Sequence, residues 1–217
     1  MGIERILVIC AGAFAMLILM FLRRKAFPTV AMWKIPMLCI LLTITGVLGT
    51  MIMFYIETGE IGGTSFYGAV LFIPILMIPA VLLRIPYNMV MDLCAPSICI
   101  MLAVMKIDCL MSGCCIGKYL PSLGFQFPSQ IVEMIVALII LFILLRLEGK
   151  GTEKNKLYPY FMILYGSTRF VLNWFRYGLV PYVWILPNSN VWSLVAIFIG
   201  GVWLILLSKS SAKKHRS

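Results

Sequence analysis

The stretch LYGSTRFVLNWFR, residues 164–176, places four polar side chains on one helical face. Tyr165, Arg169 and Asn173 recur at intervals of four, and Arg176 follows three residues later. Side chains at these spacings lie one above another along a helix. Such a column can bind a phosphate through charge-assisted hydrogen bonds, because a guanidinium offers several coplanar donors. The alternative is an interfacial anchor, in which the arginines extend toward water beside neighbouring aromatic residues.

A second candidate site is the stretch MSGCCIGKYL, residues 111–120, which separates two long apolar runs. Its adjacent cysteines, Cys114 and Cys115, could form a redox pair or bind a metal. Vicinal cysteines bridge only with strain, however, and no histidine lies nearby to complete a zinc site. We therefore expect no metal here. We expect a tight turn, shaped by Gly113 and Gly117, that lets the backbone approach a ligand.

A third polar segment is FPSQIVE, residues 127–133, which begins a helix at Pro128, where the missing N–H costs nothing. Ser129, Gln130 and Glu133 then occupy the first two turns, where the helix dipole favours a carboxylate. Taken alone, this is also the pattern of an ordinary helix start.

The remaining polar residues stand at the ends of other apolar runs. Tyr67 lies in the small, hydroxyl-rich stretch GGTSFYGAV, residues 62–70, and Lys106 and Ser112 precede the paired cysteines. A cation beside an apolar run is costly unless it meets water or a ligand. These residues are therefore added to the candidate site.

The composition identifies the class of protein. Of 217 residues, 62% are hydrophobic and 12% are charged, about half the charged share of a soluble domain. Several apolar runs are long enough to cross about 30 Å of hydrocarbon. The net charge of +10 fits loops that face anionic lipid, and we expect no nucleic-acid partner. We predict an all-α polytopic membrane protein, with residues 1–217 forming a single transmembrane domain.

We predict about seven transmembrane helices, at residues 5–22, 36–56, 66–83, 89–112, 128–147, 157–175 and 190–207. Of the 18 lysines and arginines, all but five fall in the odd-numbered connections and the C-terminal tail. Because basic residues concentrate in cytoplasmic loops, we expect the N-terminus outside and the C-terminus in the cytoplasm. The polar segments then meet on the outer side, together with the remaining five cations, Arg5, Lys106, Lys118, Arg169 and Arg176.

In this order the segments resemble the bacterial prolipoprotein diacylglyceryl transferases. The family's Gly-Gly, small-residue, His-Gly-Gly pattern is matched at 62–68, and its Gly-Arg-Ile-Gly-Asn-Phe signature lies over MKIDCLMSGCCIG, residues 105–117. Some relatives carry Gly-Cys-Cys-Tyr-Gly at the end of that signature. A Pro-Ser-Gln…Glu element and a Tyr-Gly…Arg-Phe…Phe-Arg helix are matched at 128–133 and 165–176. The likeness covers residues 60–176.

The resemblance implies a seven-span fold with an external N-terminus, in the bacterial plasma membrane. In that family, phosphatidylglycerol gives its diacylglyceryl group to a cysteine thiol of a prolipoprotein signal peptide, and glycerol phosphate is released. The partners expected here are therefore phosphatidylglycerol or a similar anionic phospholipid, and prolipoprotein signal peptides. We expect no cofactor.

The resemblance also suggests which residues hold the lipid. Arg169 is the expected phosphate clamp, assisted by Lys106 and Arg176. The other expected substrate-binding residues are Ser112, Gly113, Gly117, Gln130 and Asn173.

The residue that removes the thiol proton is left open. Candidates are Tyr67, Tyr165 and Glu133, and Asp108 is either a further one or a partner of Lys106. The family's third-span histidine is Tyr67 here, and a tyrosine of ordinary pKa, about 10, is a base only if that pKa is strongly shifted.

Other departures weaken the match to an active enzyme. The signature arginine is Lys106, the signature asparagine falls on Cys109, and a carboxylate of the sixth span is Asn173. The sole histidine, His215, lies in the tail. The alternative function is therefore a catalytically silent relative that binds lipid head groups or a membrane-inserted peptide. A small transporter is disfavoured, because the paired carboxylates and broken helices of such proteins are missing.

Overall fold

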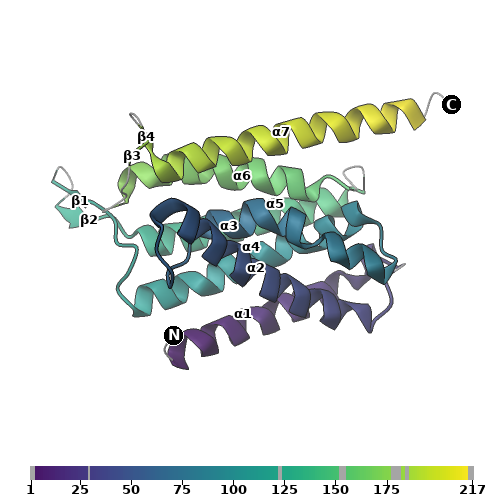
Figure 1. Ribbon diagram of the computed structural model, residues 1–217, viewed down its shortest axis with the longest axis horizontal. Helices are drawn as coiled ribbons and strands as arrows, with labels where there is room; N and C mark the ends of the chain where they lie inside the picture. Colours follow the sequence, from purple (N-terminus) through teal and green to yellow (C-terminus); the bar gives the residue numbers. More distant parts are fainter. Residues whose placement is uncertain are drawn as a thin grey trace.

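The computed structural model describes residues 3–28, 30–121, 124–151, 155–176, 182–183 and 186–214. Within them lie seven α-helices, one in each predicted apolar run (Figure 1): α1 Ile3–Leu22, α2 Lys34–Thr58, α3 Phe66–Leu76, α4 Tyr87–Met111, α5 Ser129–Gly149, α6 Leu157–Leu172 and α7 Asn188–Lys214.

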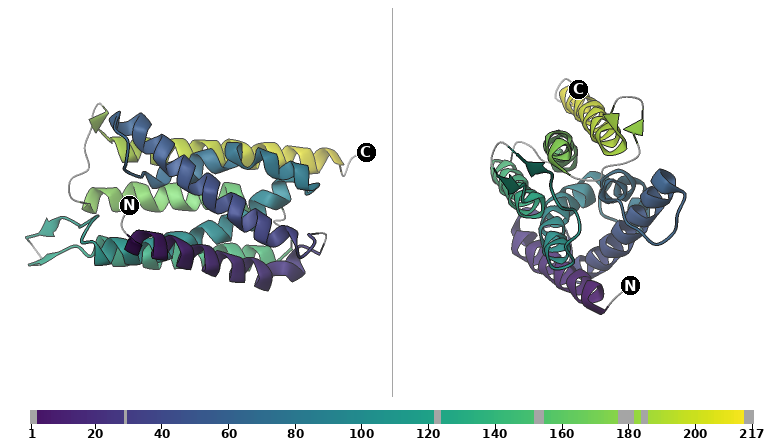
Figure 2. Two further views of the ribbon diagram at one scale, coloured as in Figure 1. Left: turned by 60° about the horizontal axis from the view of Figure 1, so that its bottom comes forward. Right: turned by 90° about the vertical axis from the view of Figure 1, so that its left-hand side faces the viewer.

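Short elements connect the helices. Three 3-10 helices are η1 Arg23–Ala26, η2 Ile78–Leu83 and η3 Asn173–Phe175. Two antiparallel hairpins pair β1 Tyr119–Leu120 with β2 Phe125–Gln126, and β3 Tyr182–Val183 with β4 Leu186–Pro187. The first hairpin projects beyond one end of the helices (Figure 2). We did not predict these hairpins, because two-residue strands leave no period in the sequence.

Helix α4 forms the centre of the bundle. It packs against α1, α5 and α6, while α2 packs on α3 and α6 on α7. In the most apolar 18-residue stretch of α4, 61% of the residues are buried inside the protein, whereas the share for α7 is 17%. The polar residues of α4 therefore lie inside the protein, where each needs a partner.

By length and composition, five of the described helices can cross a membrane: Ile6–Ala26, Lys34–Thr58, Tyr87–Met111, Ser129–Gly149 and Asn188–Ser210. The prediction of an all-α membrane protein is confirmed at this level. Helices α3 and α6, with 11 and 16 residues, are shorter than a typical span.

The third run differs from the predicted helix at 66–83. Helix α3 ends at Leu76, two residues after Pro74, and a 3-10 helix with Pro79 near its start follows. Proline removes a helical hydrogen bond and crowds the preceding turn. The two prolines therefore account for the early end of α3.

Two glycines bring α2 and α3 into close contact. A Cβ added to Gly68 would lie 1.9 Å from the carbonyl oxygen of Gly49, so neither helix could approach the other this closely with a larger residue. This contact fixes the start of α3, and with it the position of Tyr67.

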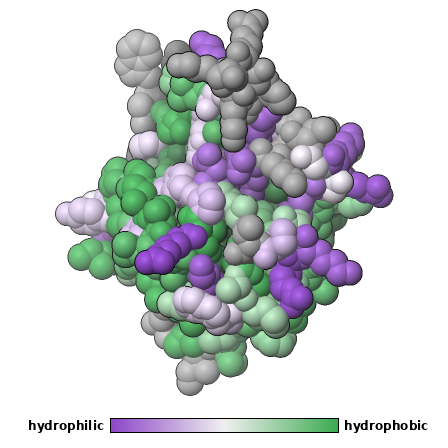
Figure 3. All heavy atoms as spheres, turned by 90° about the vertical axis from the view of Figure 1, so that its right-hand side faces the viewer, coloured by the Kyte–Doolittle hydropathy of each residue, from purple (hydrophilic) through white to green (hydrophobic). Residues whose placement is uncertain are grey.

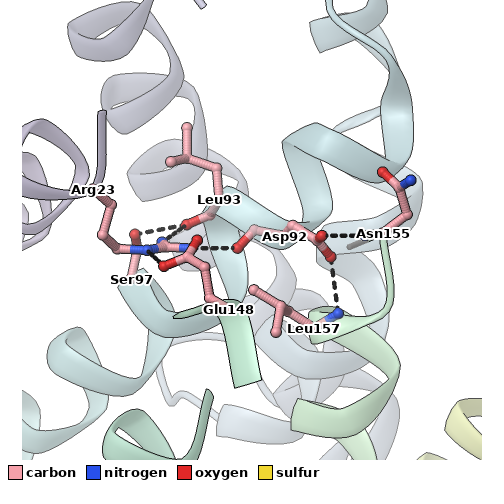
Figure 4. Close-up of polar contacts among 7 residues, drawn as sticks. All are labelled: Arg23, Asp92, Leu93, Ser97, Glu148, Asn155 and Leu157. Carbon is pink, nitrogen blue, oxygen red and sulfur yellow. Dashed lines mark hydrogen bonds and ion pairs between the residues drawn. The ribbon is translucent and has the colours of Figure 1, made fainter. Parts of the chain in front are cut away.

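At the end of α1, a buried polar network joins three helices. Arg23 donates to the carboxylate oxygens of Glu148 at 3.0 and 2.7 Å, and to the carbonyls of Asp92 and Leu93 at 2.8 Å each (Figure 4). Four hydrogen bonds satisfy a guanidinium that is only 6% exposed. The contacts hold the end of α1 against α4 and α5.

The carboxylate of Asp92 continues this network toward α6. It accepts from the backbone N–H groups of Asn155 at 2.5 Å and Leu157 at 2.8 Å. Backbone N–H groups at a helix start have no partner within the helix, so Asp92 on α4 fixes where α6 begins.

Candidate functional site

At the other end of the bundle, three cations surround one carboxylate. Glu133 forms ion pairs with Lys106 and Arg169, and its Oε1 lies 3.6 Å from Nε of Arg176. The side chain of Glu133 is only 3% exposed. Asp108 is buried and lines the same cavity as these cations, so three cations face two carboxylates. An excess of positive charge of this kind can attract an anion.

Four segments deliver these side chains. Lys106 lies near the end of α4, Glu133 in the second turn of α5, and Arg169 in the last turn of α6. Arg176 follows η3 and forms an isolated β-bridge with Gly117. The predicted convergence of distant segments is therefore present in the fold.

The aromatic rings of Tyr67 and Tyr165 support Arg169. Its guanidinium carbon lies 5.9 Å from the first ring centroid and 5.8 Å from the second, within the range of cation–π attraction. Among the described residues, neither Nε of Arg169 nor the Tyr165 hydroxyl has a hydrogen-bond partner. Arg169 is thus held in place without all its donors being used.

The Tyr67 hydroxyl belongs to a buried network with α7. It lies 2.5 Å from the Ser193 hydroxyl and accepts a 3.2 Å hydrogen bond from the Asn173 amide. The same amide donates to Asn190 at 2.8 Å. Tyr67 and Asn173, two predicted site residues, therefore meet each other and the start of α7.

The turn after α4 is fixed by the first turn of α5. The hydroxyl of Ser129 donates to the Cys115 carbonyl, and the Gln130 amide donates to the Cys114 carbonyl at 2.7 Å. Gly113 and Cys115 have left-handed backbones, with φ of 64° and 58°. Such a φ favours glycine and strains a cysteine, so the surrounding hydrogen bonds hold this conformation.

Gly117 packs directly on the chain before α5. A Cβ there would lie 2.1 Å from the carbonyl oxygen of Phe127. The Gly117 carbonyl accepts from the Gln126 amide at 3.1 Å, and the N–H of Lys118 donates to Phe175 at 2.8 Å. The tight turn predicted from the glycines is present. Gly117 contributes to it because a larger residue would not fit against Phe127.

Three thiols gather beside this turn. The sulfur atoms of Cys109, Cys114 and Cys115 lie within 4.8 Å of one another, and all three residues are half-buried. A hydrogen bond from Cys109, together with the charges of Arg176 and Lys106, lowers the pKa of Cys115, whereas burial raises the pKa of Cys114. Cys109 was not among the predicted site residues, because it lies in an apolar run, where a cysteine usually packs as a small hydrophobic residue.

A cavity of about 470 Å³ connects these groups. Its polar end is lined by Tyr67, Lys106, Asp108, Cys109, Cys114, Cys115, Arg169 and Arg176, and its apolar wall comes from α1, α2, α3 and α4. Ser112 and Gly113 are exposed and are not among the described lining residues. Gln130 and Gly117 are also not among the described lining residues. They contact the turn and the chain before α5 instead.

Sequence reasoning also missed the contribution of α7. Asn190 and Ser193 are fully buried against Tyr67 and Asn173. A signal exists, since the two polar residues stand three apart, on one helical face, within an apolar run. Their partners, however, lie far away in the sequence.

The sequence of this chain is similar to that of one known protein family. The sequence model described as prolipoprotein diacylglyceryl transferase matches residues 6–206. The chain is 27% identical to a phosphatidylglycerol–prolipoprotein diacylglyceryl transferase of Clostridium tetani, over 51% of this chain and 50% of the relative. It is 29% identical to phosphatidylglycerol–prolipoprotein diacylglyceryl transferase 2 of Clostridium perfringens, over 57% of this chain and 54% of the relative.

The aligned part spans about half the length of these curated relatives. The family match covers residues 6–206 of this chain and includes at least part of each described helix. The cation cluster, the turn after α4 and the Tyr67 network all lie inside the matched residues. The chain therefore belongs to the prolipoprotein diacylglyceryl transferase family.

Proposed function

We propose that this protein transfers a diacylglyceryl group from phosphatidylglycerol to a cysteine thiol of a prolipoprotein, at the outer face of the bacterial plasma membrane. The observation that carries this proposal is the cation cluster of Lys106, Arg169 and Arg176 around Glu133, at the polar end of the cavity. A phosphodiester entering the cluster would be held by charge-assisted hydrogen bonds.

The shape of the cavity suits an amphipathic lipid. Behind the cations its wall is apolar, with Leu42 and Val47 from α2, and Ile98 and Leu102 from α4. A volume of about 470 Å³ lies within the range of small-molecule sites, about 300–1,000 Å³. The head group would lie at the cations, and the acyl chains would leave along the apolar wall toward the bilayer.

The reaction is a substitution at a primary carbon. The thiol sulfur forms a bond to the glyceryl carbon that carries the phosphate oxygen, and that carbon–oxygen bond breaks. Glycerol phosphate leaves, and the thiol proton ends on the departing phosphate monoester. Arg169, Lys106 and Arg176 would stabilise the charge that develops on the leaving group.

Three residues of the site are candidates for removing the thiol proton. Glu133 pairs with three cations, which favours a role as counter-ion of the clamp. Tyr67 already shares its hydroxyl with Ser193 and Asn173. Tyr165 lines a small space with Arg169 and Glu133 but is not among the residues that line the main cavity.

We further propose that all seven helices span the membrane as a single domain, with the N-terminus outside. Hydrophilic residues gather on the end face where α1 and α7 end (Figure 3). Exposed basic residues at that end include Arg24, Lys25, Arg84 and Lys150 in the described connections and Arg146 in the last turn of α5. Their position agrees with a cytoplasmic face. Lys154 and Arg216, which supported the same orientation, lie outside the described residues.

A reporter that works only outside the cytoplasm tests this topology. We expect activity from fusions after Glu60 and Leu120, and none after Gly151 or at the C-terminus. Activity after Gly151 would reverse the orientation and move the cation cluster to the cytoplasmic side.

The function is tested by incubating purified protein with labelled phosphatidylglycerol and a lipobox peptide. We expect a thioether product by mass spectrometry, and none with a peptide that carries serine in place of the acceptor cysteine. An Arg169→Ala variant should make no product, whereas Arg146→Ala, an exposed arginine at the other end of the bundle, should behave as the parent.

A second candidate function is that of a silent binder of lipid head groups or of a membrane-inserted peptide. It is favoured by one observation: the candidate bases Tyr67 and Glu133 are both engaged by other protein groups. Phosphatidylglycerol binding that depends on Arg169, with no thioether at any enzyme concentration, would support this alternative.

A further inference from the structure

The three-thiol cluster of Cys109, Cys114 and Cys115 is not used by the clamp. Cys109 lies in the last turn of α4, and the N–H of Cys114 donates to the Cys109 carbonyl at 3.1 Å. The chain thus folds back on the helix end and brings all three sulfur atoms within 4.8 Å of one another.

The cluster is held in place by groups that are not cysteines. Ser129 and Gln130 bind the carbonyls of Cys115 and Cys114, and Cys115 keeps a left-handed φ of 58°. A strained backbone of this kind is retained only where its surroundings determine it. The sulfur atoms are therefore gathered before any ligand arrives.

Three sulfur ligands select a particular class of ion. Thiolates favour zinc and similar soft cations, with four ligands at tetrahedral corners and metal–sulfur bonds of about 2.3 Å. Sulfur atoms on such a tetrahedron are about 3.8 Å apart, so small side-chain rotations would suffice to close the cluster. Among the described residues the group supplies three ligands and no fourth.

The open position faces the cavity. All three cysteines line it, together with Lys106 and Arg176. A zinc site with three protein ligands leaves its fourth position to water or substrate. Three thiolates with a divalent cation carry one excess negative charge, which the nearby cations offset.

Contrary to the expectation from the sequence, which left Cys109 out of the cluster, we propose that Cys109, Cys114 and Cys115 bind a zinc-class divalent cation, and that the acceptor cysteine thiol takes the fourth position. The second part rests on the proposed function. A thiol bound to such an ion loses its proton to solvent, and solvent returns a proton to the departing phosphate. The ion would therefore form the thiolate without a protein base, whereas Tyr67, Tyr165 and Glu133 are poorly placed to take the proton. The thiolate then attacks the glyceryl carbon, as described above.

The metal site is tested with Co²⁺ alone, added to reduced, metal-free protein in detergent. We expect thiolate-to-cobalt charge-transfer absorption that Zn²⁺ abolishes. The variants Cys109→Ser, Cys114→Ser and Cys115→Ser should each lose most of it, while Cys10→Ser, at an exposed cysteine on α1, should keep it. Unchanged absorption in all three variants would overturn the site.

A second measurement needs no variant. Zn²⁺ should protect these three cysteines of the parent protein from alkylation, read by peptide mass spectrometry, and should leave Cys10 reactive. Equal labelling with and without Zn²⁺, or a disulfide among the three in protein taken from the native membrane, would contradict the proposal.

Two further additions separate this proposal from the proposed function. A lipobox peptide should intensify the cobalt absorption, and its serine version should not; equal spectra would overturn the open fourth position. Arg169→Ala should weaken phosphatidylglycerol binding by about ten- to hundredfold but keep the cobalt spectrum. Absence of transfer together with an intact three-cysteine spectrum would refute the transferase activity alone, and transfer without any metal would refute the metal site alone.

Discussion

Two buried arginines, Arg23 and Arg169, are equally enclosed and yet differently satisfied. They are 6% and 7% exposed, and each pairs with one glutamate, Glu148 or Glu133. Arg23 makes four hydrogen bonds, two of them to carbonyls (Figure 4). Arg169 shares its glutamate with two other cations, and its Nε has no partner among the described residues.

This difference separates structure from function within one bundle. The two clusters belong to opposite ends of α4. Asp92, in the first cluster, and Lys106, in the second, are about 21 Å apart along the helix at a rise of about 1.5 Å per residue. A network in which each guanidinium nitrogen has an acceptor stabilises the fold and leaves little for a ligand. A buried cluster with excess positive charge is expensive without an anion, so we infer that only the Arg169 end is built to receive one.

The largest effect, on stability, is expected at the Arg23 network. Arg23→Ala leaves Glu148 and two carbonyls without their partner, and breaking a buried pair costs about 3–5 kcal/mol. We expect a strongly lowered midpoint of thermal unfolding, followed by circular dichroism in detergent. Arg24→Ala is the matched control, because the neighbouring Arg24 is exposed. Equal midpoints for the two variants would show that the Arg23 network contributes little.

In the cation cluster, replacing the arginine by alanine should affect lipid binding more than stability. Arg169→Ala leaves Glu133 paired with Lys106 and Arg176 but removes a charge-assisted contact to phosphate, worth about 1.5–3 kcal/mol. We expect phosphatidylglycerol binding to weaken by about ten- to hundredfold, measured with lipid in mixed micelles, at a nearly unchanged midpoint. Parent-like binding would make Arg169 an interfacial anchor.

The excess positive charge of the cation cluster can be increased by neutralising Glu133. Glu133→Gln keeps the side-chain shape and removes the carboxylate that pairs with Lys106, Arg169 and Arg176. We expect phosphatidylglycerol affinity to rise by about tenfold, equivalent to about 1.4 kcal/mol, while the unliganded protein becomes less stable. Glu148→Gln, the matching change at the other end, should lower stability without raising affinity. A fall in affinity on Glu133→Gln would mean that the carboxylate contacts the substrate.

The sequence predicted what depends on local periodicity. Each apolar run contains a helix, and the four-residue spacing of Tyr165 and Arg169 placed them on one face, where the guanidinium now lies over the ring. Pro74 ended α3 early, although the apolar run continues. A long apolar run sets a span only when the backbone can stay helical.

Long-range packing was out of reach of sequence reasoning. Ser193 meets Tyr67 across 126 positions, and no short pattern specifies such a pair. Glu133 was considered as a base because it is a carboxylate among the polar segments of the candidate site. Its position between three cations, however, depends on how α4, α5 and α6 pack. Cys109 joined the paired cysteines only because the turn folds back on α4.

The smallest effect is expected from Tyr67→Phe, which removes one hydroxyl and keeps the ring under Arg169. Ser193 and Asn173 lose a buried partner, which should cost about 0.5–1.5 kcal/mol of stability. Binding of phosphatidylglycerol should be unchanged, since the clamp is intact. If the acceptor thiol is deprotonated at the cysteine cluster, thioether formation should fall less than about tenfold, or about 1.4 kcal/mol. Ser193→Ala, which removes the other hydroxyl of the pair, is the control and should behave alike. If product formation collapsed in Tyr67→Phe alone, with binding intact, the Tyr67 hydroxyl would be the group that takes the thiol proton.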